Sequence, residues 1–186
     1  MDKETGLKAL FPGLSSDPAF CVSSPENPDY NCIAWAYQMY TDRWMQPPKG
    51  MPINGLDGVT WWPDGVTEGM SIHCLLDAFQ KIGYACCPDA FHETGFQKVA
   101  LYYDPATGNW THAARESRTG EFWMSKLGQS FDIHHATPYT LEGEVYGKVY
   151  CIMKREENPL RRQGNRIKIG MGAGFLCERE EARESR

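Results

Sequence analysis

The stretch that decides the fold is YNCIAWAYQMYTDRW, at residues 30–44. Apolar and aromatic side chains cover nearly the whole surface of the helix that this pattern predicts over 32–44, so we expect that helix to be buried. Asn31 is a competent N-cap and makes Cys32 the first helical residue, and the two prolines that follow the stretch end the helix. The sequence therefore predicts a buried helix with a cysteine at its N-terminus.

The segments after this helix predict an antiparallel sheet. A second helix is expected at about 70–82, where apolar residues recur at three- and four-residue spacing before Gly83. The period then changes to two, which is typical of strands, over 96–104, 110–117, 121–127 and 148–155. Residues 1–31 are rich in Pro, Ser and Asp and predict an irregular wrapped segment. The fold class that we expect is α+β, with the first helix packed on a sheet of four to six strands.

Composition limits the classes of partner. The chain has 186 residues, which suits one domain, and a formal net charge of -5 at pH 7, which makes a nucleic-acid partner unlikely. No apolar run approaches the roughly 20 residues that cross a bilayer, and the first residues lack the apolar core of a signal peptide. We expect a cytoplasmic protein with no membrane contact. We also expect one domain over 1–155 and a charged tail over 156–186.

The seven cysteines form a poor disulfide framework, because their number is odd and their spacing is scattered, and this favours a reducing compartment. Cys86 and Cys87 lie close to His92, but adjacent cysteines point to opposite faces of an extended segment and no CxxC pair accompanies them. We therefore expect no metal and no other cofactor.

A thiol nucleophile is the chemistry that these residues favour. The N-terminus of a helix lowers the pKa of a cysteine through the helix dipole and the free N–H groups, and Cys32 has that position. First-turn N–H groups would hold an oxyanion, assisted by the side chain of Tyr30 or Asn31. His112, within WTHAARES, has small neighbours that leave room for a helix end, so it is the candidate base.

A third catalytic residue would orient His112, and the length of the turn decides which one lies opposite it. Ser125 and Lys126 are the options on the next strand; a lysine cannot accept the imidazole N–H, whereas a serine can. Asp132 and His135 are the alternatives just beyond.

Two further side chains are candidates for substrate contact. Trp62, in the loop WWP, either packs in the core or lines a substrate groove. Lys126 either extends along an edge strand to solvent or binds a substrate carboxylate.

Two segments carry a resemblance to known proteins. YNCIAWA at 30–36 and THAARESRTGEFWMSKLG at 111–128 resemble the nucleophile helix and the histidine strand of papain-like enzymes, including the NlpC/P60 and CHAP branches. The motifs FPGL, WWP, GFQKVALYYD, SKLG and DIHH, over 11–155, are similar to an uncharacterised bacterial domain family. The first resemblance implies a papain-like core with Cys32 as nucleophile, His112 as base and Ser125 or a neighbour as the orienting residue.

The function that we expect is a cysteine-dependent amide hydrolase or acyl transferase, of the peptidase, amidase or deamidase type, acting on a peptide or protein amide. Many relatives of this fold act in bacterial competition, so the resemblance also implies possible delivery as a toxin or effector by a specialised secretion system. The alternative is a non-catalytic binding domain of the same fold, whose aromatic loops contact a partner. The sequence selects neither the substrate nor the oligomeric state.

Overall fold

The computed structural model describes residues 2–28, 30–37, 43–44, 60–128 and 130–157. Helices and strands alternate irregularly along the chain. The elements run in the order α1 (Lys3–Leu10), η1 (Pro12–Ser16), β1 (Cys21–Val22), α2 (Cys32–Ala36), β2 (Arg43–Trp44), β3 (Thr60–Trp61), α3 (Ile72–Lys81), β4 (Ala85–Cys87), β5 (Phe96–Tyr103), β6 (Trp110–Glu116), β7 (Trp123–Lys126), β8 (Asp132–His135), η2 (Pro138–Leu141) and β9 (Lys148–Glu156).

Seven strands of the described part form one antiparallel sheet in the order β1-β8-β7-β6-β5-β9-β4. Strands β5, β6, β7 and β9 lie where the two-residue alternation predicts them. The sheet exceeds the predicted four to six strands because β1, β4 and β8 also join it. Strands β1 and β4 have two and three residues, too few for alternation to reveal, and the four residues of β8 were not predicted as a strand. In addition, β2 and β3 pair in parallel as a separate ribbon.

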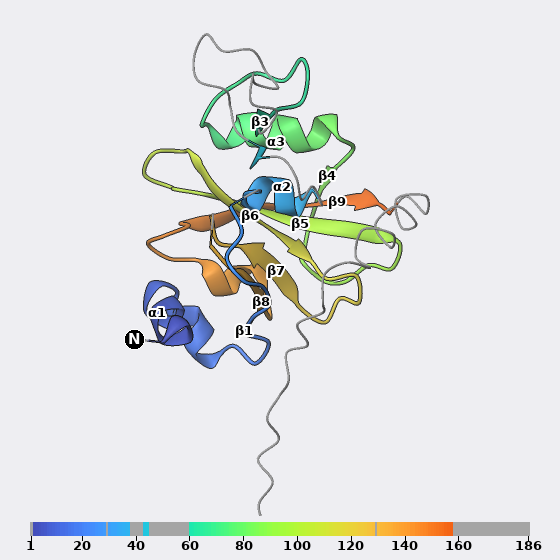
Figure 1. Cartoon of the computed structure of the whole chain (residues 1–186). Helices are drawn as coiled ribbons and strands as arrows, with labels where there is room; N and C mark the ends of the chain where they lie inside the picture. The colour runs from blue at the N-terminus through green and yellow to red at the C-terminus, as the bar shows by residue number, and fades with distance from the viewer. Residues whose placement is uncertain (1, 29, 38–42, 45–59, 129, 158–186) are drawn as a thin grey trace, which may run out of the picture.

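The two faces of the sheet carry different layers (Figure 1). Helices α2 and α3 lie on one face, and α1, η1 and η2 lie on the other. Strand β6 shows the alternation: Ala113 packs with the α2 and α3 side chains, whereas Ala114 packs with those of α1 and η1. The mixed α+β class is therefore confirmed, with α2 buried against the sheet.

Helix α2 begins as predicted but is not continuous to residue 44. Asn31 caps it, its Oδ1 accepting the N–H of Ala34 at 3.0 Å. Arg43 and Trp44 are in β2 instead of the helix, and the residues between 37 and 43 lie outside the described part. An apolar pattern on every side does not distinguish a buried helix from a strand, so the predicted end was wrong.

The irregular segment predicted for 1–31 was also wrong, because it contains α1. Asp2 caps this helix by accepting the N–H of Thr5 at 2.9 Å, and Leu7 is buried. The cap lies before a Gly-containing helix of low apolar content, so the helical spacing is weak. At the other end of the chain, β9 continues to Glu156, one residue past the predicted domain boundary, and the predicted tail from residue 158 onward lies outside the described residues.

Asp17 ties the N-terminal segment to the sheet. Its carboxylate accepts the backbone N–H of Ala136, which follows β8, at 2.8 Å and the hydroxyl of Thr140, in η2, also at 2.8 Å. It also accepts the N–H of Ala19 at 2.8 Å. One carboxylate thus joins η1, the end of β8 and η2.

We predict that Asp17→Ala lowers the free energy of unfolding by about 1–3 kcal/mol, because several donors lose their acceptor. Urea denaturation measures this loss. Asp104→Ala is the matched control: that carboxylate accepts the N–H of Ala106 at 2.9 Å within a single exposed turn, so its loss should cost less. Equal losses in the two variants would contradict the role given to Asp17.

Candidate functional site

Cys32 is the first residue of α2 and is buried, with 9% of its surface exposed. Burial raises the pKa of its thiol to about 11, and hydrogen bonds from the backbone N–H groups of Ala113 and Ile33 offset part of that rise. The sulfur therefore faces the peptide N–H that directly follows His112. At neutral pH the group is a thiol, in contrast with the lowered pKa that its helical position alone predicts.

His112 lies in β6 and starts a chain of hydrogen bonds across three strands. Its Nε2 is 3.0 Å from the Ser125 hydroxyl in β7, which is 2.9 Å from Nε2 of His135 in β8. Nδ1 of His135 is 2.7 Å from the carbonyl oxygen of Thr137. The structure thus brings together three residues that the sequence analysis proposed: the base and two of the candidates for its orienting partner.

The acceptor at the end of this chain determines which atom of each hydrogen bond carries the proton. The carbonyl of Thr137 accepts only, so Nδ1 of His135 donates and its Nε2 accepts from Ser125. The Ser125 oxygen then accepts the Nε2–H of His112, which leaves Nδ1 of His112 with a lone pair. That Nδ1 is buried and has no hydrogen-bond partner among the described residues. A neutral imidazole in this form is a proton acceptor at Nδ1.

Two aromatic rings fix the plane of the His112 imidazole. Tyr146 stacks on it with ring centroids 4.0 Å apart and an angle of 5°, and Tyr102 contacts it edge-on at 5.2 Å. Burial holds the pKa of His112 well below the usual histidine value and lowers that of His135 to about 4. Both histidines are therefore neutral at pH 7.

Cys32 and His112 are neighbours without a direct bond between them. The imidazole packs on the face of the sheet opposite to α2, while the sulfur reaches the N–H of Ala113 from the α2 side. Burial, followed by the charge of Cys32, raises the pKa of Tyr146, the residue stacked on His112. The free Nδ1 of His112 makes no hydrogen bond to the thiol.

A second polar cluster holds the candidates Tyr30, Lys126 and Asp132. The Tyr30 hydroxyl donates to Asp132 at 2.9 Å, and the Lys126 ammonium is 3.7 Å from the same carboxyl group and 5.0 Å from the Tyr30 ring centroid. Burial raises the pKa of Asp132. Asp132 is therefore bonded to Tyr30 and not to the histidine chain.

The burial of Lys126 settles its environment. Its side chain is fully buried and its ammonium donates to the carbonyl of Ser130, so it does not extend to solvent as an edge lysine. Its contacts with Asp132, the Tyr30 ring and the Ser130 carbonyl join Tyr30 to the β7–β8 hairpin. The residue just before Cys32 in the chain, Asn31, is used as the helix cap.

Trp62 is fully buried in the core between α2, α3 and the sheet. Its indole Nε1 has no hydrogen-bond partner among the residues that the structure describes. The packing interpretation of this tryptophan fits this position better than the groove interpretation.

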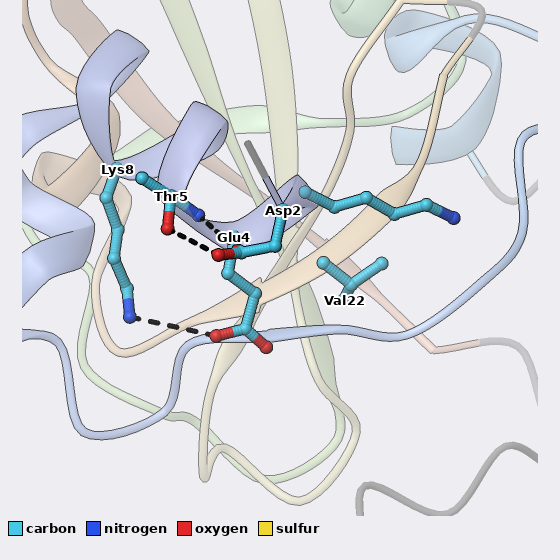
Figure 2. Close-up of a pocket in the computed structure, with 6 residues that line it drawn as sticks. Asp2, Glu4, Thr5, Lys8 and Val22 are labelled. Carbon is cyan, nitrogen blue, oxygen red and sulfur yellow. Dashed lines mark hydrogen bonds and ion pairs between the residues drawn. The ribbon is translucent and has the colours of Figure 1, made fainter.

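A surface depression of about 630 Å³ lies elsewhere, over the N-terminus of α1 (Figure 2). Its lining residues are Asp2, Lys3, Glu4, Thr5, Lys8 and Val22. Figure 2 shows that several of their polar groups bond to one another: Thr5 to Asp2, and Lys8 to Glu4 at 3.7 Å. It contains none of the residues that the sequence analysis proposed for catalysis.

Two participants were missed by sequence reasoning. Tyr146 comes from the turn before β9, and Thr137 contributes only a backbone carbonyl. Nothing in the spacing of either residue connects it to His112, because both contacts depend on how η2 and the following turn cross the sheet.

Within the described ranges, no group of three or more His, Cys, Asp and Glu side chains could hold a metal ion. Likewise, among the helices of the described residues none combines the length and the apolar character needed to span a membrane.

The fold and this site define a class: an α+β domain in which a buried thiol at a helix start meets the first strand of a histidine–serine–histidine chain that crosses three strands. The chain belongs to the family called Domain of unknown function (DUF7689), whose model matches residues 21–154. The match includes α2, all the residues of the histidine chain and most of β9. No curated protein and no solved structure matches the chain.

We predict that the free energy of unfolding falls as the pH drops from about 6.5 towards 4. The folded state lowers the pKa values of His112 and His135, so the unfolded state binds more protons in this range. Each histidine contributes up to about 1.4 kcal/mol per pH unit. Urea denaturation at several pH values gives the slope.

His135→Gln should reduce that slope, whereas His73→Gln, at an exposed position in α3, should leave it unchanged. The same slope in wild type and both variants would show that the buried histidines do not control acid stability.

Proposed function

We propose that the protein is a cysteine-dependent amide hydrolase or acyl transferase, with Cys32 as nucleophile and His112 as general base. One observation carries the proposal: the sulfur of Cys32 meets the peptide next to His112, whose Nε2 is committed to Ser125 and whose Nδ1 retains a lone pair without a partner among the described residues. A base that is oriented at one nitrogen and free at the other is what thiol activation requires.

The overall arrangement adds support for a papain-like core. Such a core places a cysteine at the start of a helix that packs on an antiparallel sheet, with the histidine on one strand and its orienting residue on a neighbouring strand. Here α2 carries Cys32, β6 carries His112 and β7 carries Ser125. In this proposal His135 and the carbonyl of Thr137 extend the orienting role beyond Ser125.

The resting protonation states determine the mechanism that we propose. Burial keeps Cys32 as a thiol and His112 as a neutral imidazole, so no thiolate–imidazolium pair exists before substrate binds. The thiol proton would move to Nδ1 of His112 as the sulfur attacks the amide carbonyl. The same proton would then pass to the departing amine, and water would hydrolyse the thioester in a second round. An amine in place of water would give acyl transfer.

A rearrangement around β6 is part of this proposal, because the sulfur of Cys32 and the imidazole of His112 pack on opposite faces of the sheet. The sulfur makes no hydrogen bond to the imidazole, so the two groups have to approach one another when substrate displaces the side chains around the thiol. In enzymes without substrate, catalytic contacts are often longer than in the complex.

The alternative, a non-catalytic binding domain, is favoured by one specific observation, the raised pKa of Cys32. A buried, protonated thiol is also what a structural cysteine would be. The two candidates differ in one measurable property, which is whether the reactivity of Cys32 depends on His112.

We predict that p-nitrophenyl acetate, a small activated ester, acetylates Cys32 and that His112→Gln slows this reaction roughly 100-fold, a typical contribution of a general base. Mass spectrometry of peptides measures acetylation at Cys32 and, in the same sample, at the exposed Cys86. The rate at Cys86 should not change, because this thiol lies in the edge strand β4, away from His112.

The pH dependence separates the two candidates further. With His112 as base, the rate at Cys32 should be nearly constant between pH 6 and 8, because the imidazole is already neutral there. Without it, the rate should rise about tenfold per pH unit as the thiolate fraction grows.

Two variants serve as controls. Ser125→Ala should lower the rate at Cys32 by a smaller factor than His112→Gln. His134→Asn, which alters the neighbouring histidine in β8 outside the hydrogen-bond chain, should leave it near wild type. A tenfold rise per pH unit already in the wild-type protein, unaffected by His112→Gln, would exclude the catalytic proposal and support the binding domain.

A further inference from the structure

A pair of cysteines lies at the sheet edge formed by β4 and β9, away from Cys32. In the described part of the chain five cysteines are free thiols, Cys32, Cys74, Cys86, Cys87 and Cys151, and Cys21 is disulfide-bonded. Cys86 is exposed in the edge strand β4, and Cys151 is half-buried in β9. Neither residue takes part in the site described above.

Strand register puts these two side chains on one face. Cys86 is directly opposite Met153, so Cys151, two residues earlier in β9, is its diagonal neighbour. Both Met153 and Cys151 pack against the core on the α2 and α3 side. Cys87 is opposite Ile152 and packs with the other core, so its thiol points away.

The two thiols also interact directly. Burial comes first among the causes that raise the pKa of Cys151 to about 12, and the neighbouring charge of Cys86 and a hydrogen bond with its side chain add to it. The exposed thiol is therefore in contact with a half-buried second thiol, an arrangement in which one cysteine meets an oxidant and the other resolves the product.

We propose that Cys86 and Cys151 form a reversible redox pair, which hydrogen peroxide converts into a disulfide. The Cys86 sulfur attacks one peroxide oxygen, which gives a sulfenic acid and one water molecule. The sulfur of Cys151 then attacks the Cys86 sulfur, forming the S–S bond and releasing a second water molecule. In total two thiols lose two electrons and two protons, and one peroxide is reduced to two molecules of water.

The diagonal placement explains why the disulfide would be reversible. Diagonal Cβ atoms across an antiparallel pair are typically about 7 Å apart, whereas a disulfide brings them to about 4 Å. Strand β4 has three residues and, in the described part of the chain, pairs in the sheet only with β9, so few hydrogen bonds oppose its displacement. A bond that forms only when an edge strand is displaced is strained, and a strained disulfide is more easily reduced.

The experiment treats the full chain, purified under argon, with hydrogen peroxide at one to ten molar equivalents. Non-reducing peptide mass spectrometry should find a crosslink between the segments containing Cys86 and Cys151 in more than half of the molecules. Reduced glutathione should then remove this crosslink.

Variants assign the sulfur atoms. Because Cys86 and Cys87 fall in one peptide, Cys87→Ser is the matched control and should crosslink as wild type does. Cys86→Ser should abolish the crosslink. Cys151→Ser should leave a sulfenic acid on Cys86 that dimedone captures, at a level several-fold above wild type.

Three results would overturn the proposal. The first is a crosslink that disappears in Cys87→Ser, since it would assign the bond to the other face of β4. The second is oxidation of Cys86 to sulfinic acid in wild type without any crosslink. The third is peroxide treatment that leaves both thiols reduced.

Discussion

The contact between α2 and β6 is the constraint on which the rest of the molecule depends. Four of the five residues of α2 are buried, and the strand side chain beneath them is the small, fully buried Ala113. Because alanine occupies this place, the start of the helix approaches the strand closely enough for the Cys32 sulfur to accept a backbone N–H. A bulkier residue at this point would lift the helix and separate the sulfur from the strand.

The charged side chains around this contact, Arg115, Lys126 and Asp132, are buried, and each contacts a polar or aromatic partner. Arg115 stacks on Trp35 at 3.9 Å and donates to its carbonyl at 3.1 Å, so β6 holds the far end of α2 as well. On the other side, the Tyr30–Asp132–Lys126 cluster holds the residues that lead into α2. A buried pair of this kind contributes little net stability, but it penalises any arrangement in which a partner is missing. Both ends of a short helix are thus fixed by side chains of the sheet.

Much of this organisation could be predicted from the sequence, and the part that could not has physical reasons. Alternation revealed β5, β6, β7 and β9, and the Asn31 cap placed Cys32 at the helix start. The partner of His112 could not be predicted because it depends on the register of the hairpin. Ser125 is opposite Ala114, two residues after His112 on the same face, so the serine reaches the imidazole diagonally across the two strands. The contact of Tyr146 with His112 could not be predicted, since stacking between distant segments produces no periodic pattern in the sequence. The pKa of Cys32 was expected to be low from its helical position, whereas burial raises it.

The carbonyl of Thr137 has a consequence that extends far beyond its own turn. It belongs to the backbone, so no side-chain substitution removes it, and it can only accept a hydrogen bond. Every donor upstream must therefore point towards it, and the three side chains behind it have a single allowed polarity. All the hydrogen bonds of the chain run in one direction, and the carbonyl at its end sets that direction. The residue that decides which nitrogen of His112 carries the hydrogen is one that never touches that ring.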